Sequence, residues 1–283
     1  MRQAVRDGLA VRALRANRGA GTLRAMQTVP DACLRLAHRL ADAAGEIIRP
    51  RYRQPFTSEL KSDNSPVTEI DMAVETRLRE IVAAEAPDHG FIGEEFPPEK
   101  ADAEFAWVVD PIDGTVAFMC GMPLFGTLIA LRHGGEYVLG VIDQPITNER
   151  WIGADGHGAF LNGVAIRTRA CPDIAQAVVT SSGPDDYARE EYPAMRPVHQ
   201  AGKWILYGTA CYDYGLLAMG FQDIVVDAQL GEHDFAAPAA VIRNAGGATC
   251  DWQGRPLDGN SDGRVLMVGD PALLSPCLEL LHG

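Results

Sequence analysis

Two apolar segments in the first half of the chain run directly into acidic residues. Residues 91–95 (FIGEE) have the pattern of a short strand that ends in Glu94 and Glu95. Residues 105–115 (FAWVVDPIDGT) have the pattern of a second strand, which ends in Asp-Pro and then a glycine turn. Short continuous apolar runs bounded by turn residues are typical of buried strands. Two strands therefore deliver carboxylates at their carboxyl ends, and any fold of this chain has to place that charge beside a buried core.

Helical and strand patterns alternate through the rest of the chain. Helices are predicted from Asp31, as a capping residue, to Pro50, over 72–87 with Thr68 placed to cap it, and over 210–221, 236–247 and 271–283. From Thr127 the apolar residues alternate, and Gly-Gly and Asn-Gly turns indicate antiparallel hairpins. Further strands are predicted at 177–182, 204–208, 223–229 and 264–270. The alternation predicts an α+β or layered α/β fold whose halves meet near residues 145–170.

The charge of the chain is acidic and unevenly distributed. Among 283 residues there are 38 Asp and Glu against 25 Lys and Arg, a formal net charge of -13. This excess argues against binding to nucleic acid by counterion release, and an anionic ligand would need the help of metal ions. Residues 1–25 differ, because they carry six Arg and one Asp. We therefore expect an Arg-rich tail (1–25), an N-terminal α+β half with the acidic motifs (26–150) and a C-terminal α/β half (151–283).

Two further features concern location. No apolar run approaches the roughly 18–20 residues that span a bilayer, so no membrane helix is expected. The six cysteines are spread without a CxxC pair, which indicates reduced thiols and a cytoplasmic protein rather than a disulfide framework or zinc ribbon. The Arg-rich leader lacks the apolar block of a secretory signal. It is interpreted as a mobile tail, or as the product of a start codon assigned before Met26, with an organellar transit peptide as the alternative.

The acidic residues that follow the strands suit a metal–phosphate site. Hard oxygen ligands with no His or Cys nearby favour Mg²⁺ over zinc. An Asp-Pro-x-Asp turn can present the carboxylates of Asp110 and Asp113, with the carbonyl of Ile112, to one point in space. Gly114 permits close approach of the backbone, and Thr115 opens a helix or turn whose free N–H groups can hold a phosphate. Asp-Pro and Asp-Gly pairs are also common in simple turns, but their combination with the upstream GEE favours a site.

These segments resemble the inositol monophosphatase family, within the lithium-sensitive, magnesium-dependent phosphatase superfamily. GEE (93–95), DPIDGT (110–115) and HDFAAPAAVIRNAGG (233–247) occur in the family's order and spacing, and the similarity extends from about Val29 to the C-terminus. The resemblance implies an α+β fold, a layered αβαβα sandwich of the inositol monophosphatase/fructose bisphosphatase type. It also implies a homodimer, a small phosphorylated substrate and two or three Mg²⁺ ions in each active site.

The resemblance further implies roles for individual residues. Glu94, Asp110 and the Ile112 carbonyl would hold the first metal, and Asp110, Asp113 and Asp234 the second. Glu94 and Thr115 would orient and deprotonate the attacking water, and Asp71 would act beside the metal cluster. The residues expected to bind substrate are Lys61, Gly114, Thr115, Gly208, Thr209, Ala210 and Asp227. Glu95 is not expected to be a direct ligand.

One departure from the family pattern concerns the substrate. Most inositol-phosphate enzymes have Trp directly before the last metal aspartate, whereas this chain has His233. Residues 123–163 and 208–221 more closely resemble the histidinol-phosphate phosphatases of plants and bacteria. We therefore expect Mg²⁺-dependent hydrolysis of histidinol phosphate, with Asp227 paired to the cationic end of the substrate. The alternative substrates, in order of preference, are inositol phosphates, nucleotide 3′-phosphates and sugar bisphosphates.

Two other kinds of function are alternatives. One is a regulatory binding role of the same fold, because a bacterial member of the family works with the transcription machinery. The other is a purely structural role, against which the complete ligand set argues. Tyr212, Tyr214 and Trp204 are expected to pack in the core rather than to bind a ligand.

Overall fold

The computed structural model describes residues 28–60, 66–185, 187–188 and 190–283. The tail (1–25) and Lys61 lie outside these residues. Within them the helices are α2 (Asp31–Ile48), α3 (Glu69–Glu85), α4 (Thr115–Met119), α5 (Glu191–Ala201), α6 (Tyr212–Ala218), α7 (Glu232–Ala245) and α8 (Leu274–His282), with 3₁₀ turns η1 (Ile174–Gln176) and η2 (Pro271–Leu273). The strands are β1 (Ser58–Leu60), β2 (Pro66–Thr68), β3 (Gly90–Gly93), β4 (Phe105–Asp113), β5 (Gly126–His133), β6 (Glu136–Gln144), β7 (Glu149–Ala154), β8 (Gly158–Leu161), β9 (Val164–Ala165), β10 (Val178–Ser181), β11 (Trp204–Tyr207), β12 (Ile224–Asp227), β13 (Ala248–Asp251) and β14 (Val265–Val268).

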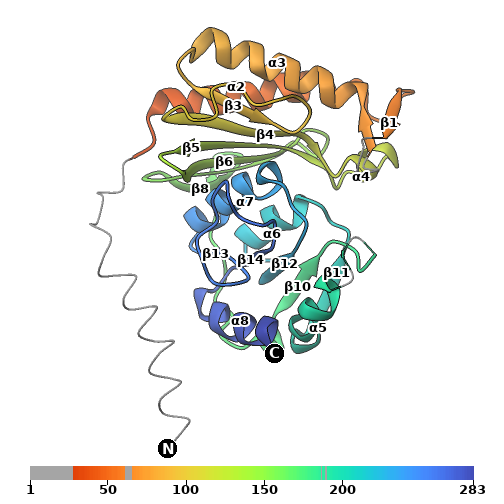
Figure 1. Cartoon of the computed structure of the whole chain (residues 1–283), viewed down its shortest axis with the longest axis vertical. Coiled ribbons are helices and arrows are strands. Elements are labelled where there is room, and N and C mark those ends of the chain that lie inside the picture. Colours follow the sequence, from red (N-terminus) through yellow and green to blue (C-terminus); the bar gives the residue numbers. More distant parts are fainter. Residues whose placement is uncertain (1–27, 61–65, 186, 189) are drawn as a thin grey trace, which may run out of the picture.

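The elements stack in five layers (Figure 1). Helices α2 and α3 cover one face of a seven-stranded sheet with the order β3-β4-β5-β6-β7-β8-β9. Helices α6 and α7 lie between the other face and a five-stranded sheet with the order β11-β10-β12-β14-β13. Helices α5 and α8 cover the outer face of this second sheet. The layered αβαβα sandwich predicted from the sequence is therefore confirmed.

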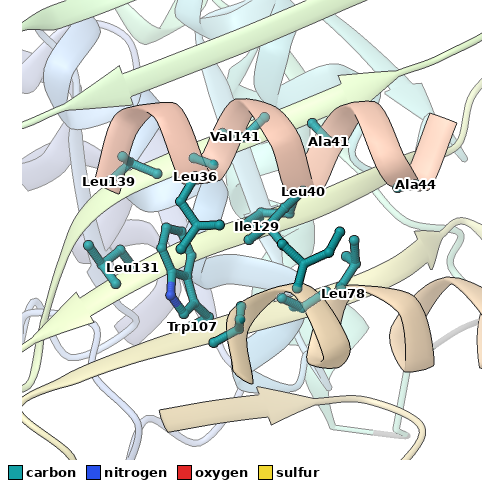
Figure 2. Packing of buried hydrophobic residues seen from close by; sticks show 14 of the residues in the cluster. Leu36, Leu40, Ala41, Ala44, Leu78, Trp107, Ile129, Leu131, Leu139 and Val141 are labelled. Carbon is teal, nitrogen blue, oxygen red and sulfur yellow. The ribbon is translucent and has the colours of Figure 1, made fainter. Parts of the chain in front are cut away.

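The seven-stranded sheet is apolar on both faces because each face is covered by helices. Adjacent residues of β4, Val108 and Val109, belong to different cores, as expected when successive side chains point to opposite faces. On the outer face, Leu36 and Leu40 of α2 pack with Leu78 of α3 over Trp107 of β4 (Figure 2). Trp107 has no exposed surface. The apolar residues of α2 recur at helical spacing, so one stripe of the helix meets the sheet.

Helix α7 is held closely against the other face of this sheet. A Cβ atom on Gly140 of β6 would lie only 2.1 Å from the carbonyl oxygen of Ala237 in α7. The missing side chain at Gly140 therefore allows the helix backbone to approach the strand. Because α7 begins at Glu232, this contact fixes the start of the helix relative to the strands that carry the acidic residues.

Several local predictions are corrected by the structure. Asp31 is the first helical residue rather than the cap, because Pro30 occupies the capping position without a side-chain bond. Thr68 caps α3 as predicted, but the helix starts three residues earlier than expected, at Glu69. The hairpin of β1 and β2, helix α5 and strand β13 were not predicted. The expected division between residues 150 and 151 falls inside β7, since the first sheet continues to Ala165.

The helices and the cysteines bear on the expected location of the protein. None of the helices in the described part of the chain is long and apolar enough to cross a bilayer. All six cysteines are described and all are free thiols, as predicted. The cytoplasmic location stays a prediction.

Candidate functional site

The ends of β3 and β4 bring acidic residues to one edge of the seven-stranded sheet. The two strands are parallel neighbours, with Gly93 paired to Val109. Glu94 follows β3 directly, and Asp110 and Asp113 lie in the last part of β4. The pairing of β4 with β5 shifts between Asp110 and Asp113, and such irregularities redirect side chains. The sheet thus places these three acids together, as the sequence predicted.

Helix α7 supplies the fourth acid from far along the chain. Asp234 is the third residue of the helix, and its Oδ2 accepts a hydrogen bond of 2.7 Å from the backbone N–H of Gly231. This contact satisfies a free N–H at the helix start and fixes the carboxylate. Potential ligand atoms of Asp110, Asp113 and Asp234 all lie within 4.8 Å of one another.

A second group of potential ligands shares Asp110. It consists of Glu94, Asp110 and His233, whose ligand atoms also lie within 4.8 Å of one another. Glu94 and Asp110 were predicted to hold a metal together. The expectation that no histidine lies near the acids is wrong, because α7 carries the ring of His233 into the cluster beside Asp234. The sequence marked His233 as a departure from the family pattern, but not as a neighbour of Glu94.

Burial and mutual repulsion perturb the carboxyl groups of this cluster. Burial, together with the charges of Glu94, Asp113 and Asp234, raises the pKa of Asp110 well above its usual range. Burial and then the charge of Asp234 raise the pKa of Asp113 to about 7. The pKa of Asp234 is also raised, chiefly by burial. Acids buried together are stable only if they hold protons or share a cation, so this oxygen-rich donor set fits Mg²⁺.

The turn after β4 has the geometry expected of a site that binds a small anion. Gly114 adopts a left-handed conformation with φ of 82°, and a Cβ there would lie 2.8 Å from the Cβ of Ala210. Thr115 begins α4, and its Oγ1 donates to the Ile112 carbonyl at 3.1 Å. The Asp110 Oδ1 accepts a hydrogen bond from the Ile112 N–H at 2.9 Å. The DPIDGT segment is therefore held in one shape by its own side chains.

Asp71 has a structural role and also lies close to the cluster. Its Oδ2 accepts a hydrogen bond of 2.9 Å from the Thr68 N–H and a second from the Thr68 hydroxyl, which completes the cap of α3. Its Oδ1 is buried without a hydrogen-bond partner among the described residues. Burial raises its pKa, and the charge of Glu94 contributes in the same direction. Asp71 therefore keeps one oxygen without a partner in the described part of the chain and is near enough to Glu94 for their charges to interact.

Glu75 is a further residue of the site that the sequence analysis did not identify. It is fully buried, one helical turn after Asp71, and accepts a hydrogen bond of 2.8 Å from the Glu95 N–H. A Cβ on Gly93 would lie 2.1 Å from its Oε1. Glu75 also pairs with Arg79 at 2.6 Å. The spacing of Asp71, Glu75 and Arg79 by four residues places them on one face of α3 and could have indicated this role from the sequence. Through Glu75, helix α3 holds the GEE segment.

The predicted substrate loop lies against the DPIDGT turn. Gly208 and Ala210 have positive φ of 73° and 44°. For Ala210 this is a strained conformation, of the kind that accumulates at functional sites. The Cys211 N–H donates to the Asp113 Oδ2 at 2.7 Å. Thr209 points elsewhere, because its Oγ1 donates to Asp213 at 3.0 Å.

Asp227 lies beside this loop, and the chain itself uses both of its oxygens. Oδ1 accepts hydrogen bonds from the Tyr187 hydroxyl at 2.7 Å and the Ala228 N–H at 3.0 Å. Oδ2 accepts from the Ser182 hydroxyl at 2.8 Å and the Ser182 N–H at 3.2 Å. Burial raises the pKa of Asp227 to about 6 despite these bonds. A substrate cation at Asp227 would therefore share the carboxylate with donors of the chain.

A second buried acid near Asp227 was not predicted to be functional. Burial, and then the charge of Asp227, raises the pKa of Asp213 to about 8. Its Oδ2 accepts from Thr209, whereas its Oδ1 is buried with no hydrogen-bond partner in the described part of the chain. In the sequence, the α6 segment showed only aromatic residues expected to pack in the core, so no pattern distinguished this acid. With these raised pKa values, the two buried acids beyond the metal cluster do not both ionise readily near pH 7.

Comparisons with known proteins show the family of the chain. A family model described as "Inositol monophosphatase family" matches residues 30–278. "Bifunctional phosphatase IMPL2, chloroplastic" of Arabidopsis thaliana is 43% identical over 256 residues, 87% of this chain and 74% of that protein. A "Histidinol-phosphatase" of Chlorobaculum parvum is 34% identical and covers 82% of this chain and 90% of its own length. A "Nus factor SuhB" of Pasteurella multocida is also 34% identical and covers 78% and 85%, respectively.

A solved structure of the same fold also belongs to an inositol monophosphatase. A solved inositol monophosphatase from Zymomonas mobilis matches with a TM-score of 0.83 and 43% identity, covering 91% of this chain and 100% of that chain. The chain therefore belongs to the inositol monophosphatase family and is a phosphatase of that family.

Proposed function

We propose that this protein is a Mg²⁺-dependent phosphomonoesterase that hydrolyses histidinol phosphate to histidinol and phosphate, with water as the nucleophile. The observation that carries the proposal is the partly buried acidic cluster, in which two groups of potential ligands share the buried Asp110. Family membership supports phosphate-ester hydrolysis, and a relative named histidinol-phosphatase supports the substrate.

The residues of the cluster have distinct proposed roles in holding metal. Glu94, Asp110 and the carbonyl of Ile112 would hold one Mg²⁺, and Asp110, Asp113 and Asp234 would hold the other. Bound Mg²⁺ would supply positive charge for the phosphate and would lower the pKa of a water molecule, so that hydroxide is available at neutral pH. Asp110 joins the two positions, so its carboxylate cannot be replaced by a group with a single acceptor.

The residues of the turn position the nucleophile. Because the Thr115 hydroxyl donates its proton to the Ile112 carbonyl, its lone pairs are left to accept a hydrogen bond from water. Glu94 then takes the proton of that water as general base, with Asp71 beside it. The free N–H groups after Gly114 hold phosphate oxygens. Lys61 is proposed to contact the phosphate as well, and that role stays a prediction.

Selection of a cationic alcohol rests on a pair of buried acids beyond the cluster. Asp213 and Asp227 are both at least nine-tenths buried, and the charge of Asp227 acts on Asp213. An imidazolium or ammonium group relieves that repulsion, whereas a neutral polyol does not. Gly208, Thr209 and Ala210 would shape the space between this region and the phosphate.

A comparison of two substrates tests the proposal. We expect kcat/KM for histidinol phosphate to exceed that for inositol 1-phosphate by at least about tenfold, which corresponds to about 1.4 kcal/mol of differential transition-state binding. Asp227→Asn should lower kcat/KM for histidinol phosphate more than kcat/KM for inositol 1-phosphate. The control Asp102→Asn, at an exposed position, should change neither value. Equal losses on both substrates would remove Asp227 as the selecting residue. A preference of the native protein for inositol 1-phosphate would contradict histidinol phosphate as the substrate.

Inositol phosphate is the second candidate substrate. It is favoured by the likeness to the inositol monophosphatase of Zymomonas mobilis, which is as similar in sequence as the plant relative. A regulatory role of the same fold also stays open as a prediction, with the relative named Nus factor SuhB in its support.

The predicted homodimer has one supporting feature in the structure. Strand β11 is an edge strand, and its Trp204, Leu206 and Tyr207 are 62%, 46% and 39% exposed. The expectation that Trp204 packs in the core is therefore wrong, although Tyr214 is buried as predicted. An apolar edge strand is usually covered, and a second copy of this chain would cover it. Sedimentation of the protein as a monomer would contradict the homodimer.

A further inference from the structure

The ring of His233 lies within the acidic cluster. One of its nitrogens is within 4.8 Å of carboxylate oxygens of both Glu94 and Asp110. Its Nε2 is 3.5 Å from the Asp234 Oδ1, which is too long for a strong hydrogen bond. An imidazole nitrogen beside two carboxylates is a potential metal ligand.

The backbone before α7 holds the ring in this place. A Cβ on Gly231 would lie 2.4 Å from Cε1 and 2.8 Å from Nε2 of His233, so the ring occupies the space that a side chain at position 231 would fill. The Gly231 N–H is bound to Asp234, which fixes the same turn. The ring is 24% exposed, so solvent ions reach it. Its position is therefore set by packing.

The two groups of ligands differ in chemistry because of this ring. Asp110, Asp113 and Asp234 offer only oxygen, which suits Mg²⁺. Glu94, Asp110 and His233 offer two carboxylates and an imidazole nitrogen, a set that suits zinc and other later transition metals. We propose that His233 is a further metal ligand and that the Glu94–Asp110–His233 group, which would hold Mg²⁺ in the proposed function, also binds Zn²⁺ through the imidazole nitrogen. The inference deepens the proposed function, because it concerns a metal position of the same site.

The experiment measures metal binding directly on the full chain freed of metal. Zn²⁺ is added to protein whose histidines carry ¹⁵N, and imidazole nitrogen resonances assigned through the backbone are followed by NMR. We expect the His233 ring signal to shift at one equivalent of Zn²⁺. By calorimetry, His233→Gln should weaken Zn²⁺ binding by at least about tenfold while changing Mg²⁺ affinity by less than about twofold. The matched control is His282→Gln, at an exposed residue next to the C-terminus, which should bind both metals as the native protein does.

The possible outcomes separate the inference from the proposed function. Binding of Zn²⁺ without a shift of the His233 signal overturns the inference, and this readout does not depend on the folding of any variant. Equal Zn²⁺ affinity of the native protein and His233→Gln overturns it as well. If the His233 signal shifts but the protein hydrolyses no phosphate ester, the result supports His233 as a metal ligand and contradicts the proposed function. Phosphatase activity without any His233 shift supports the proposed function alone.

Discussion

Removal of divalent cations should alter the pH dependence of stability, in a direction set by the acidic cluster. In the metal-free protein, burial and the charge of Asp234 raise the pKa of Asp113 from 3.8 to about 7. The folded state therefore holds this proton more tightly than the unfolded state. The contribution of Asp113 to the free energy of unfolding is fully present below about pH 4 and is lost as the pH rises through about 7. At 1.36 kcal/mol per pKa unit, the loss between about pH 5 and about pH 8 is about 2–3 kcal/mol, and the raised pKa values of Asp110 and Asp234 act in the same direction.

Urea unfolding at the two pH values, with chelator and with excess Mg²⁺, measures this effect. A bound cation favours the ionised carboxylates, so the stabilisation by Mg²⁺ should be larger at pH 8 than at pH 5 by at least about 2 kcal/mol. Asp213 and Asp227 also have raised pKa values, but they lie outside the ligand groups and cancel in the difference. Asp102→Asn serves as the control because it removes an exposed acid. Equal stabilisation by Mg²⁺ at both pH values would refute the reasoning.

Three substitutions test the other parts of the site. Asp110→Asn keeps an acceptor for the Ile112 N–H but loses the shared ligand, so turnover should fall more than about a thousandfold with a native far-UV spectrum; near-native kcat would contradict a shared metal ligand. Thr115→Ala should lower kcat by about tenfold to a hundredfold with little change in KM, because orientation of water matters in the transition state; an unchanged kcat would remove Thr115 from the mechanism. Gly114→Ala should reduce the free energy of unfolding by about 1–3 kcal/mol, since φ is 82° and the new Cβ meets Ala210; urea unfolding at native stability would show that the loop adapts.

Local patterns in the sequence were sufficient for the elements and for part of the site. The two acidic strand ends, the cap at Thr68 and the glycine after α7 all depend on interactions within a few residues, and each lies where it was predicted. The order of the acidic motifs also led to the family and to its five layers. Short strands such as β13 and the hairpin of β1 and β2 were missed because so few residues give no clear period.

Tertiary packing decided which side chains meet. His233 lies next to Asp234 in sequence, yet only the contact of α7 with the seven-stranded sheet places its ring near Glu94, some 140 residues away in the chain. Glu75 holds the GEE segment, and Asp213 faces Asp227, through contacts between separate elements. The sequence by itself determined the kinds of ligand and their order along the chain. Their distances, pKa values and shared partners were decided by the fold, because electrostatic and hydrogen-bond interactions depend on separation in space and on burial, which no local pattern contains.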